Sequence, residues 1–390
     1  MISGTTKLIA HIGYPTESFK APLIYNPWFE SRGIDAAVVP MGVKATDFPT
    51  AVKAIFAMTN IHGALVTMPH KVTSVGILDA GSEAVRISGA CNAILKRPDG
   101  SLFGEMFDGE RSDALSYAAV TVSIPPNRTV GQVQWPTVPP GDPKRDFVTV
   151  SADYIDHRAF AATIAETARR NKNPRVLIFV HGFNNRFDDA VYRFAQIVHD
   201  TKAEAVPVLF TWPSRGNIEL KSYTYDRESA NYSRDGLEEL IDEISKYPSI
   251  KEVHLLAHSM GTWVTLEALR GRSMRRVARG EDKVKQAFLV APDIDVDVFR
   301  GTMRRMGPNR PKMLLFVSQD DGALSLSKQI WGGIPRIGEV NPELEPYKTE
   351  LARERIAVYD LTGMKNSAGG TAHSRAFDDI NQVMAMVRDR

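Results

Sequence analysis

The sequence of 390 residues contains a single cysteine, Cys91, so no disulfide bond can form within the chain. No stretch approaches the roughly 20 consecutive apolar residues of a membrane-spanning helix. The first residues also lack the charged start and apolar run of a secretory signal peptide. We therefore expect a cytoplasmic protein without a membrane span.

The chain also has little net charge, because 48 Lys and Arg residues oppose 46 Asp and Glu residues and leave a formal charge of +2. A nucleic-acid-binding surface typically shows a strong basic excess, so we expect no nucleic-acid partner. Hydrophobic residues make up 43% of the chain and charged residues 24%, which is typical of folded proteins. At roughly 150 residues per domain, the length predicts two or three domains.

Motifs for metals and nucleotides are missing from the sequence. It contains no phosphate-binding Gly-x-x-x-x-Gly-Lys loop, no His-Glu-x-x-His pair, no paired cysteines, and no Gly-x-Gly-x-x-Gly after a strand. We therefore expect neither a cofactor nor a bound metal. The sequence carries no signal for the oligomeric state.

Proline density divides the chain. Six prolines lie between residues 125 and 143, where they disfavour helix and central strand alike because each lacks a backbone N–H. We interpret residues 111–150 as an extended segment that leads into a larger domain at 151–390. In residues 1–110, which precede this segment, the sequence pattern predicts short strands separated by helices and hence a smaller α/β domain.

The larger domain alternates strands and helices. The apolar runs RVLIFV, VPVLFTW, VHLLAHS, QAFLVAP, KMLLFVS and IAVYDLT are separated by segments of helical periodicity, such as DDAVYRFAQIVHD. This alternation predicts a doubly wound α/β fold with a parallel sheet, whose chemistry lies at the carboxyl ends of the strands.

The sharpest local feature is a serine between a strand and a helix, in LLAHSMG. Ser259 has small residues two positions before and after it, Ala257 and Gly261, where strand and helix crowd together in a nucleophile elbow. We therefore predict Ser259 as a catalytic nucleophile. The backbone N–H groups of Met260 and of Phe183, in the turn HGF after RVLIFV, are the candidate oxyanion-hole donors.

A serine nucleophile needs a base, and His373 is the candidate. It follows the last predicted strand, which is where the chain order Ser, acid, His places the base. The other eight histidines all precede that strand. The acid lies between the two. Asp321, after KMLLFVS, is preferred, with its neighbour Asp320 and the earlier Asp293 as alternatives.

From about Leu115 to its end, the sequence resembles a bacterial α/β-hydrolase family of unknown function. The resemblance rests on the motifs FVHGFNNRFDDAVYRFAQ, FTWPSRG, YDRESANYSRD and HLLAHSMG. It implies the doubly wound hydrolase fold and a triad of Ser259, Asp321 and His373, and it names no substrate.

Residues 1–110 resemble the substrate-binding domain of shikimate dehydrogenase, through VTMPHK, GACN and GEMFDG. The resemblance implies a vestigial site with Lys71, Asn92 and Asp108 in the place of that family's catalytic lysine, asparagine and aspartate. Two serines that bind the substrate carboxylate in that family are replaced by Phe19 and Ala21. The nicotinamide-binding domain is missing, so we expect no dehydrogenase activity.

Two functions follow as hypotheses. The first is a serine hydrolase of small-molecule carboxylic esters, of the carboxylesterase or lipase type; thioesters and amides would use the same residues. The alternative is a non-catalytic protein that binds a small molecule in the first domain and uses the hydrolase fold as a scaffold. The first domain would cover the active site under the first hypothesis and hold a ligand of its own under the second.

Overall fold

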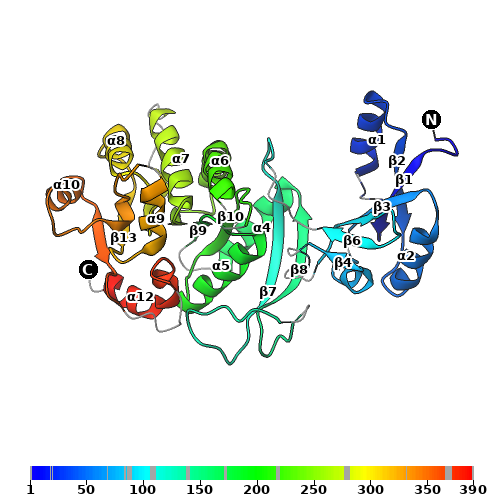
Figure 1. Ribbon diagram of the computed structural model, residues 1–390, viewed down its shortest axis with the longest axis horizontal. Helices are drawn as coiled ribbons and strands as arrows, with labels where there is room; N and C mark the ends of the chain where they lie inside the picture. Colours follow the sequence, from blue (N-terminus) through cyan, green and yellow to red (C-terminus); the bar gives the residue numbers. More distant parts are fainter. Residues whose placement is uncertain are drawn as a thin grey trace. The chain divides into compact units, whose positions relative to one another are not determined.

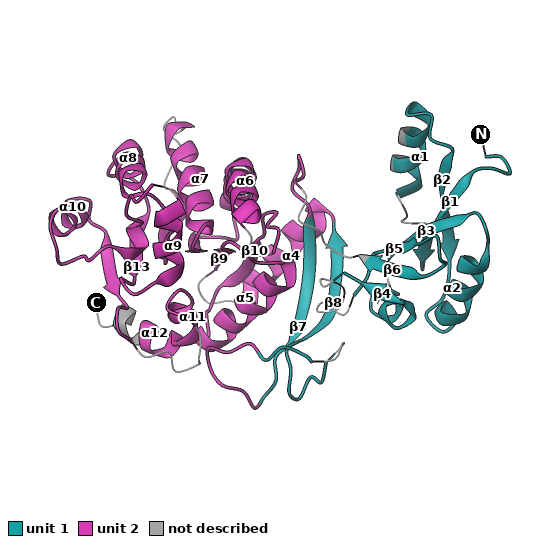
Figure 2. Ribbon diagram, in the orientation of Figure 1, with its two compact units in different colours: residues 1–108, 117–126, 134–155 teal, residues 109–116, 127–133, 156–390 magenta. Residues whose placement is uncertain are grey.

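A computed structural model describes residues 2–17, 19, 21–67, 69–82, 85, 90–105, 111–137, 141–170, 174–216, 220–275, 282–330, 332–364 and 371–388. The chain forms two compact units (Figure 2). Unit 1 comprises residues 1–108, 117–126 and 134–155, and unit 2 comprises residues 109–116, 127–133 and 156–390. Segments from the proline-rich region therefore belong to both units.

Unit 1 is built around a mixed six-stranded sheet with the order β2-β1-β3-β5-β6-β4. The pairs β1–β2, β1–β3 and β4–β6 are parallel, whereas β3–β5 and β5–β6 are antiparallel. Its elements are β1 (Lys7–Gly13), α1 (Ala21–Ser31), β2 (Ala36–Gly42), α2 (Phe48–Ala57), β3 (Ile61–Val66), the 3-10 helix η1 (Thr73–Ile77), β4 (Ala80–Gly81), β5 (Ala93–Lys96) and β6 (Leu102–Glu105).

A hairpin completes unit 1. Strand β7 (Tyr117–Ser123) pairs antiparallel with β8 (Val148–Ile155), and Ala152 and Val120 pack in the same core cluster as α2 and β3. This differs from the extended segment expected over 111–150. The described prolines of this region, Pro125, Pro126, Pro136 and Pro143, lie in the connection between the two strands, where their missing N–H groups interrupt no pairing.

Unit 2 contains a fully parallel six-stranded sheet with the order β10-β9-β11-β12-β13-β14. Its strands are β9 (Arg175–Val180), β10 (Val206–Phe210), β11 (Glu252–His258), β12 (Val284–Val290), β13 (Lys312–Val317) and β14 (Ala357–Asp360). Each lies within one of the six apolar runs or overlaps it closely, and the predicted α/β class is confirmed.

Helices cover both faces of this sheet (Figure 1). Helix α7 packs between α6 and α8, and α5 packs against α12. The helices are α4 (His157–Arg170), α5 (Phe187–Thr201), α6 (Leu220–Lys246), α7 (Gly261–Arg275), α8 (Val296–Met306), α9 (Gly322–Ile330), the 3-10 helix η2 (Ile337–Glu339), α10 (Tyr347–Arg353), α11 (Arg375–Asp378) and α12 (Ile380–Arg388). The carboxyl ends of the strands lead into the loops that carry the candidate site.

Candidate active site

Ser259 occupies the turn between β11 and α7 with a positive φ of 51°. A non-glycine residue rarely adopts this conformation, and such strain clusters at functional turns. The turn is held on both sides, since Ser259 N–H donates to the Val290 carbonyl at 2.9 Å and its own carbonyl accepts from Thr262 N–H at 3.1 Å. Among the residues described, the Ser259 hydroxyl has no hydrogen-bond partner.

Two glycines let the neighbouring backbones approach this serine. At Gly261, a Cβ would fall 2.5 Å from the carbonyl oxygen of Val180, at the end of β9, and closer still to that of His181. At Gly182, a Cβ would fall 2.9 Å from the Cβ of Ser259. Such distances exclude any side chain, so both positions require glycine for the strand, turn and helix to pack this closely.

Phe183 and Met260 flank the serine. Within the part of the chain that the structure describes, neither backbone N–H donates a hydrogen bond. Met260 directly precedes α7, where the helix dipole favours negative charge. The Phe183 ring packs edge-on against Tyr223 at 5.1 Å between ring centroids. Both N–H groups therefore remain candidate oxyanion-hole donors.

His181 fixes the turn that carries Phe183. Its Nε2 accepts the backbone N–H of Trp212 at 3.1 Å, so Nδ1 carries the proton and donates to the Gly182 carbonyl at 2.9 Å. The indole N–H of Trp212 donates to the His181 carbonyl at 2.8 Å, and the two rings stack. Burial lowers the pKa of His181 to about 4, so its ring is neutral and acts as a fixed support.

His373 and Asp321 are joined directly. The Nδ1–H of His373 donates to Asp321 Oδ2 at 2.7 Å, while Asp321 Oδ1 accepts the N–H groups of Ala323 and Leu324. Burial opposes ionisation of the fully buried Asp321, but the hydrogen bond and charge of His373 and these two N–H groups outweigh it and lower its pKa. The His373 side chain keeps 19% exposure, and its Nε2 is left as a proton acceptor.

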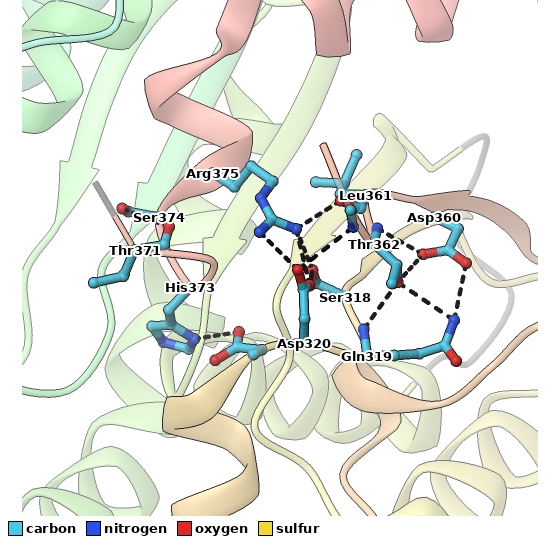
Figure 3. A network of polar contacts seen from close by, with 12 residues as sticks. Ser318, Gln319, Asp320, Asp360, Leu361, Thr362, Thr371, His373, Ser374 and Arg375 are labelled. Carbon is cyan, nitrogen blue, oxygen red and sulfur yellow. Dashed lines mark hydrogen bonds and ion pairs between the residues drawn. The ribbon is translucent and has the colours of Figure 1, made fainter. Parts of the chain in front are cut away.

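The alternative acid Asp320 points elsewhere. Its two carboxylate oxygens each accept from one terminal nitrogen of Arg375, both at 2.9 Å (Figure 3). This pairing, with the Ser318 hydroxyl, holds the pKa of Asp320 well below its usual range. Arg375 also donates to the Leu361 carbonyl at 2.7 Å. Asp320 therefore anchors the segment that follows His373, and Asp321 is the carboxylate in contact with the imidazole.

The other alternative, Asp293, lies in a separate buried network. It accepts hydrogen bonds from the hydroxyls of Tyr223 and Ser327, each at 2.6 Å, and pairs with Arg336 at 3.2 Å. Asp293 contacts the turn at Ser259 only through its backbone N–H, which donates to the Ser259 carbonyl at 3.4 Å. Its carboxylate is occupied by these three groups and does not contact His373.

His258, which is part of the elbow motif LLAHSMG, also contacts the candidate base. Its Nε2 lies 3.0 Å from the carbonyl oxygen of His373, and the two ring centroids are 4.8 Å apart. Burial, together with the nearby His373, lowers the pKa of His258 to about 3. No local sequence signal could reveal this contact, because the two residues are 115 positions apart.

Lys71 in unit 1 is nearly buried and is held by strand β8. Its ammonium pairs with Asp153 at 3.4 Å, lies 3.4 Å from the Ala152 carbonyl, and sits 5.6 Å from the centroid of the Tyr154 ring. Burial lowers the pKa of Lys71, and Asp153 counteracts part of that effect. Residues of the hairpin therefore pair with Lys71, the lysine that the resemblance assigns to a vestigial site.

Asn92 and Phe19 are further positions of that site. Asn92 accepts the Val66 N–H through its backbone carbonyl at 2.7 Å, and Asp108 lies outside the described residues. Phe19, in the place of a carboxylate-binding serine, stacks on His11 with ring centroids 4.1 Å apart. No cluster of His, Cys, Asp or Glu suited to a metal ion, and no helix long and apolar enough to cross a bilayer, occurs in the described parts of the chain.

Comparison with known protein families finds a match for unit 2. The model of a family described as alpha/beta hydrolase of unknown function (DUF900) matches residues 156–390, more than half of the chain. The chain belongs to this family. The DUF900 match covers Ser259, Asp321 and His373, and it establishes a hydrolase fold without naming a substrate.

Unit 1 matches a second family, the shikimate dehydrogenase substrate binding domain, over residues 11–94. The chain is 31% identical over 119 residues to shikimate dehydrogenase (NADP(+)) of Acidiphilium cryptum, which is 30% of this chain and 41% of that enzyme. It is 36% identical over 108 residues to the enzyme of Rubrobacter xylanophilus, which is 28% and 38%. The alignments thus span about two fifths of these relatives. Both resemblances noted in the sequence are confirmed.

Among solved structures, a shikimate 5-dehydrogenase from Listeria monocytogenes aligns over 99% of this chain and 98% of its own, at 13% identity and a TM-score of 0.28.

Proposed function

We propose that this DUF900 protein is a serine hydrolase that cleaves carboxylic esters through an acyl-enzyme on Ser259. The observation that carries the proposal is the hydrogen bond between His373 and a buried, ionised Asp321, in the same unit as a serine held at positive φ. An aspartate in this position orients the imidazole and stabilises the imidazolium that forms during proton transfer.

The first half of the proposed reaction transfers the acyl group. Because Nδ1 of His373 carries its proton against Asp321, Nε2 is free to take the hydroxyl proton of Ser259 as its oxygen attacks the ester carbonyl. The N–H groups of Phe183 and Met260 stabilise the resulting oxyanion. When the intermediate collapses, the bond to the alcohol breaks, and the imidazolium returns its proton to the departing alcohol oxygen.

The second half releases the acid. Water attacks the acyl-enzyme and gives a proton to His373 Nε2. The second tetrahedral intermediate then collapses to the carboxylic acid, and the His373 imidazolium returns its proton to the departing Ser259 oxygen. Atoms and protons balance without a further reactant.

Hydrolysis of p-nitrophenyl esters from acetate to decanoate tests the proposal. We expect turnover by the wild-type protein, a loss of several orders of magnitude in Ser259→Ala, and no loss in Ser273→Ala, a matched change within α7. The dependence of the rate on acyl-chain length then shows how long an acyl chain the site accepts. Equal rates for wild type and Ser259→Ala would refute the assignment of the nucleophile.

The binding-protein alternative receives less support. A ligand that used Lys71 would have to displace the ion pair with Asp153 and the contact with Tyr154. Breaking a nearly buried pair without replacing it leaves an uncompensated charge, which is costly.

A further inference from the structure

His258 lies at the end of β11, one residue before Ser259, and reaches across to the segment that carries His373. A carbonyl oxygen only accepts, so the contact of 3.0 Å is a hydrogen bond from the Nε2–H of His258 to the main chain of His373. The rings of Phe377 and His258 pack in a T-shaped contact, with centroids 5.1 Å apart. One side chain thus links the backbone beside the nucleophile to the backbone of the base.

This donor does not switch with pH. Burial keeps the pKa of His258 near 3, so the ring stays neutral with its proton on Nε2. It therefore neither competes with His373 as a base nor adds a charge beside it. Its Nδ1 faces the close approach at Gly182, where a Cβ would lie 3.1 Å from that nitrogen.

We propose that His258 is a positioning residue for His373, an inference that rests on the proposed function. Asp321 fixes the rotation of the His373 ring through Nδ1, and His258 fixes its main chain. Orienting both the ring and the backbone is necessary because a displacement of about 1 Å at a catalytic group can cost roughly 100-fold in rate. Arg375 holds the far side of the same segment through Asp320 and Leu361.

Substitutions at His258 separate its donor from its volume. His258→Phe keeps the ring and removes the donor, whereas His258→Gln keeps an N–H donor of similar reach. We expect kcat for a p-nitrophenyl ester to fall roughly 10- to 100-fold in His258→Phe with KM nearly unchanged, and His258→Gln to recover most of it. His254→Phe, on the same strand, is the control and is expected to retain wild-type kcat.

A signal independent of turnover is the proton on His373 Nδ1, observed by NMR in protein labelled with ¹⁵N-histidine. Asp321→Ala identifies the resonance by removing the acceptor. We expect the resonance to broaden or disappear in His258→Phe and to persist in His258→Gln, even if no ester is hydrolysed. A wild type that shows the resonance without turnover would therefore count against the ester substrate and leave the positioning role testable.

Folded His258→Phe protein with wild-type kcat and an unchanged resonance would overturn the proposal. So would folded His258→Gln protein as impaired as His258→Phe, because the donor would then not be the cause. If His258→Phe does not fold, His258→Leu and His258→Gln provide the same comparison.

Discussion

Replacing Gly261 with alanine tests the close approach of α7 to β9. The added Cβ would meet the carbonyl oxygens of Val180 and His181, and the latter is held by the indole N–H of Trp212 at 2.8 Å. These are backbone atoms that cannot rotate away. Forcing a methyl group into such a site typically costs 1–3 kcal/mol, so we expect Gly261→Ala to lower the free energy of unfolding by about 2–3 kcal/mol.

Gly301 provides the matched control. It lies within α8, and a Cβ built there has nothing within 4 Å. Alanine at an exposed helical position is favoured over glycine by roughly 0.5–1 kcal/mol, so Gly301→Ala is expected to stabilise the protein. Urea unfolding followed by far-UV circular dichroism measures both changes. Gly261→Ala protein as stable as wild type would refute the proposed packing of the elbow.

Three further predictions concern the triad, pH and unit 1. Asp321→Asn is expected to lower kcat about 10⁴-fold, as loss of the triad carboxylate does in other serine hydrolases. Asp320→Asn is expected to retain most of the wild-type kcat. Ester assays in which Asp320→Asn is the more impaired variant would exclude Asp321 as the acid. The pKa of His181 lies near 4 against an ordinary value of about 6.5, so the unfolded chain binds the extra proton, and stability falls as the pH drops below 6.5. We expect about 2 kcal/mol less unfolding free energy at pH 5 than at pH 7.5 from this group, and His181→Asn, measured by urea unfolding, should show a correspondingly smaller pH dependence. Because the ammonium of Lys71 is already paired, calorimetry with shikimate or quinate is expected to give no binding heat; heat that vanishes in Lys71→Met would contradict this.

Local patterns predicted most of unit 2 because its sheet is parallel and buried. The run RVLIFV corresponds to β9, Arg175–Val180, and the other five runs mark the remaining strands to within a few residues. The turn at Ser259 was also recognisable, since a strand, a small residue, a serine and a glycine follow one another locally.

Contacts between distant residues were beyond such patterns. Asp320 and Asp321 are adjacent and chemically identical, and they differ only in what the fold brings to them. Arg375, 55 positions from Asp320, donates to that residue, whereas Asp321 accepts from His373 and from two N–H groups in the first turn of α9. No periodicity in the sequence encodes this choice.

The β7–β8 hairpin was missed for a related reason. Its strands are separated by 24 residues rich in proline and glycine, so neither a tight turn nor a short loop signals the pairing. The contact of Lys71 with Asp153, 82 positions later, depends on that pairing and was equally hidden.

The most direct test of the central claim is covalent labelling of Ser259. A fluorophosphonate reacts with an activated serine by forming an oxygen–phosphorus bond and releasing fluoride, independently of the natural ester. Peptide mass spectrometry is expected to find one adduct, on Ser259, that is absent in Ser259→Ala and forms far more slowly in His373→Ala. Labelling of a different residue, or equal labelling rates in wild type and His373→Ala, would contradict a serine nucleophile activated by His373.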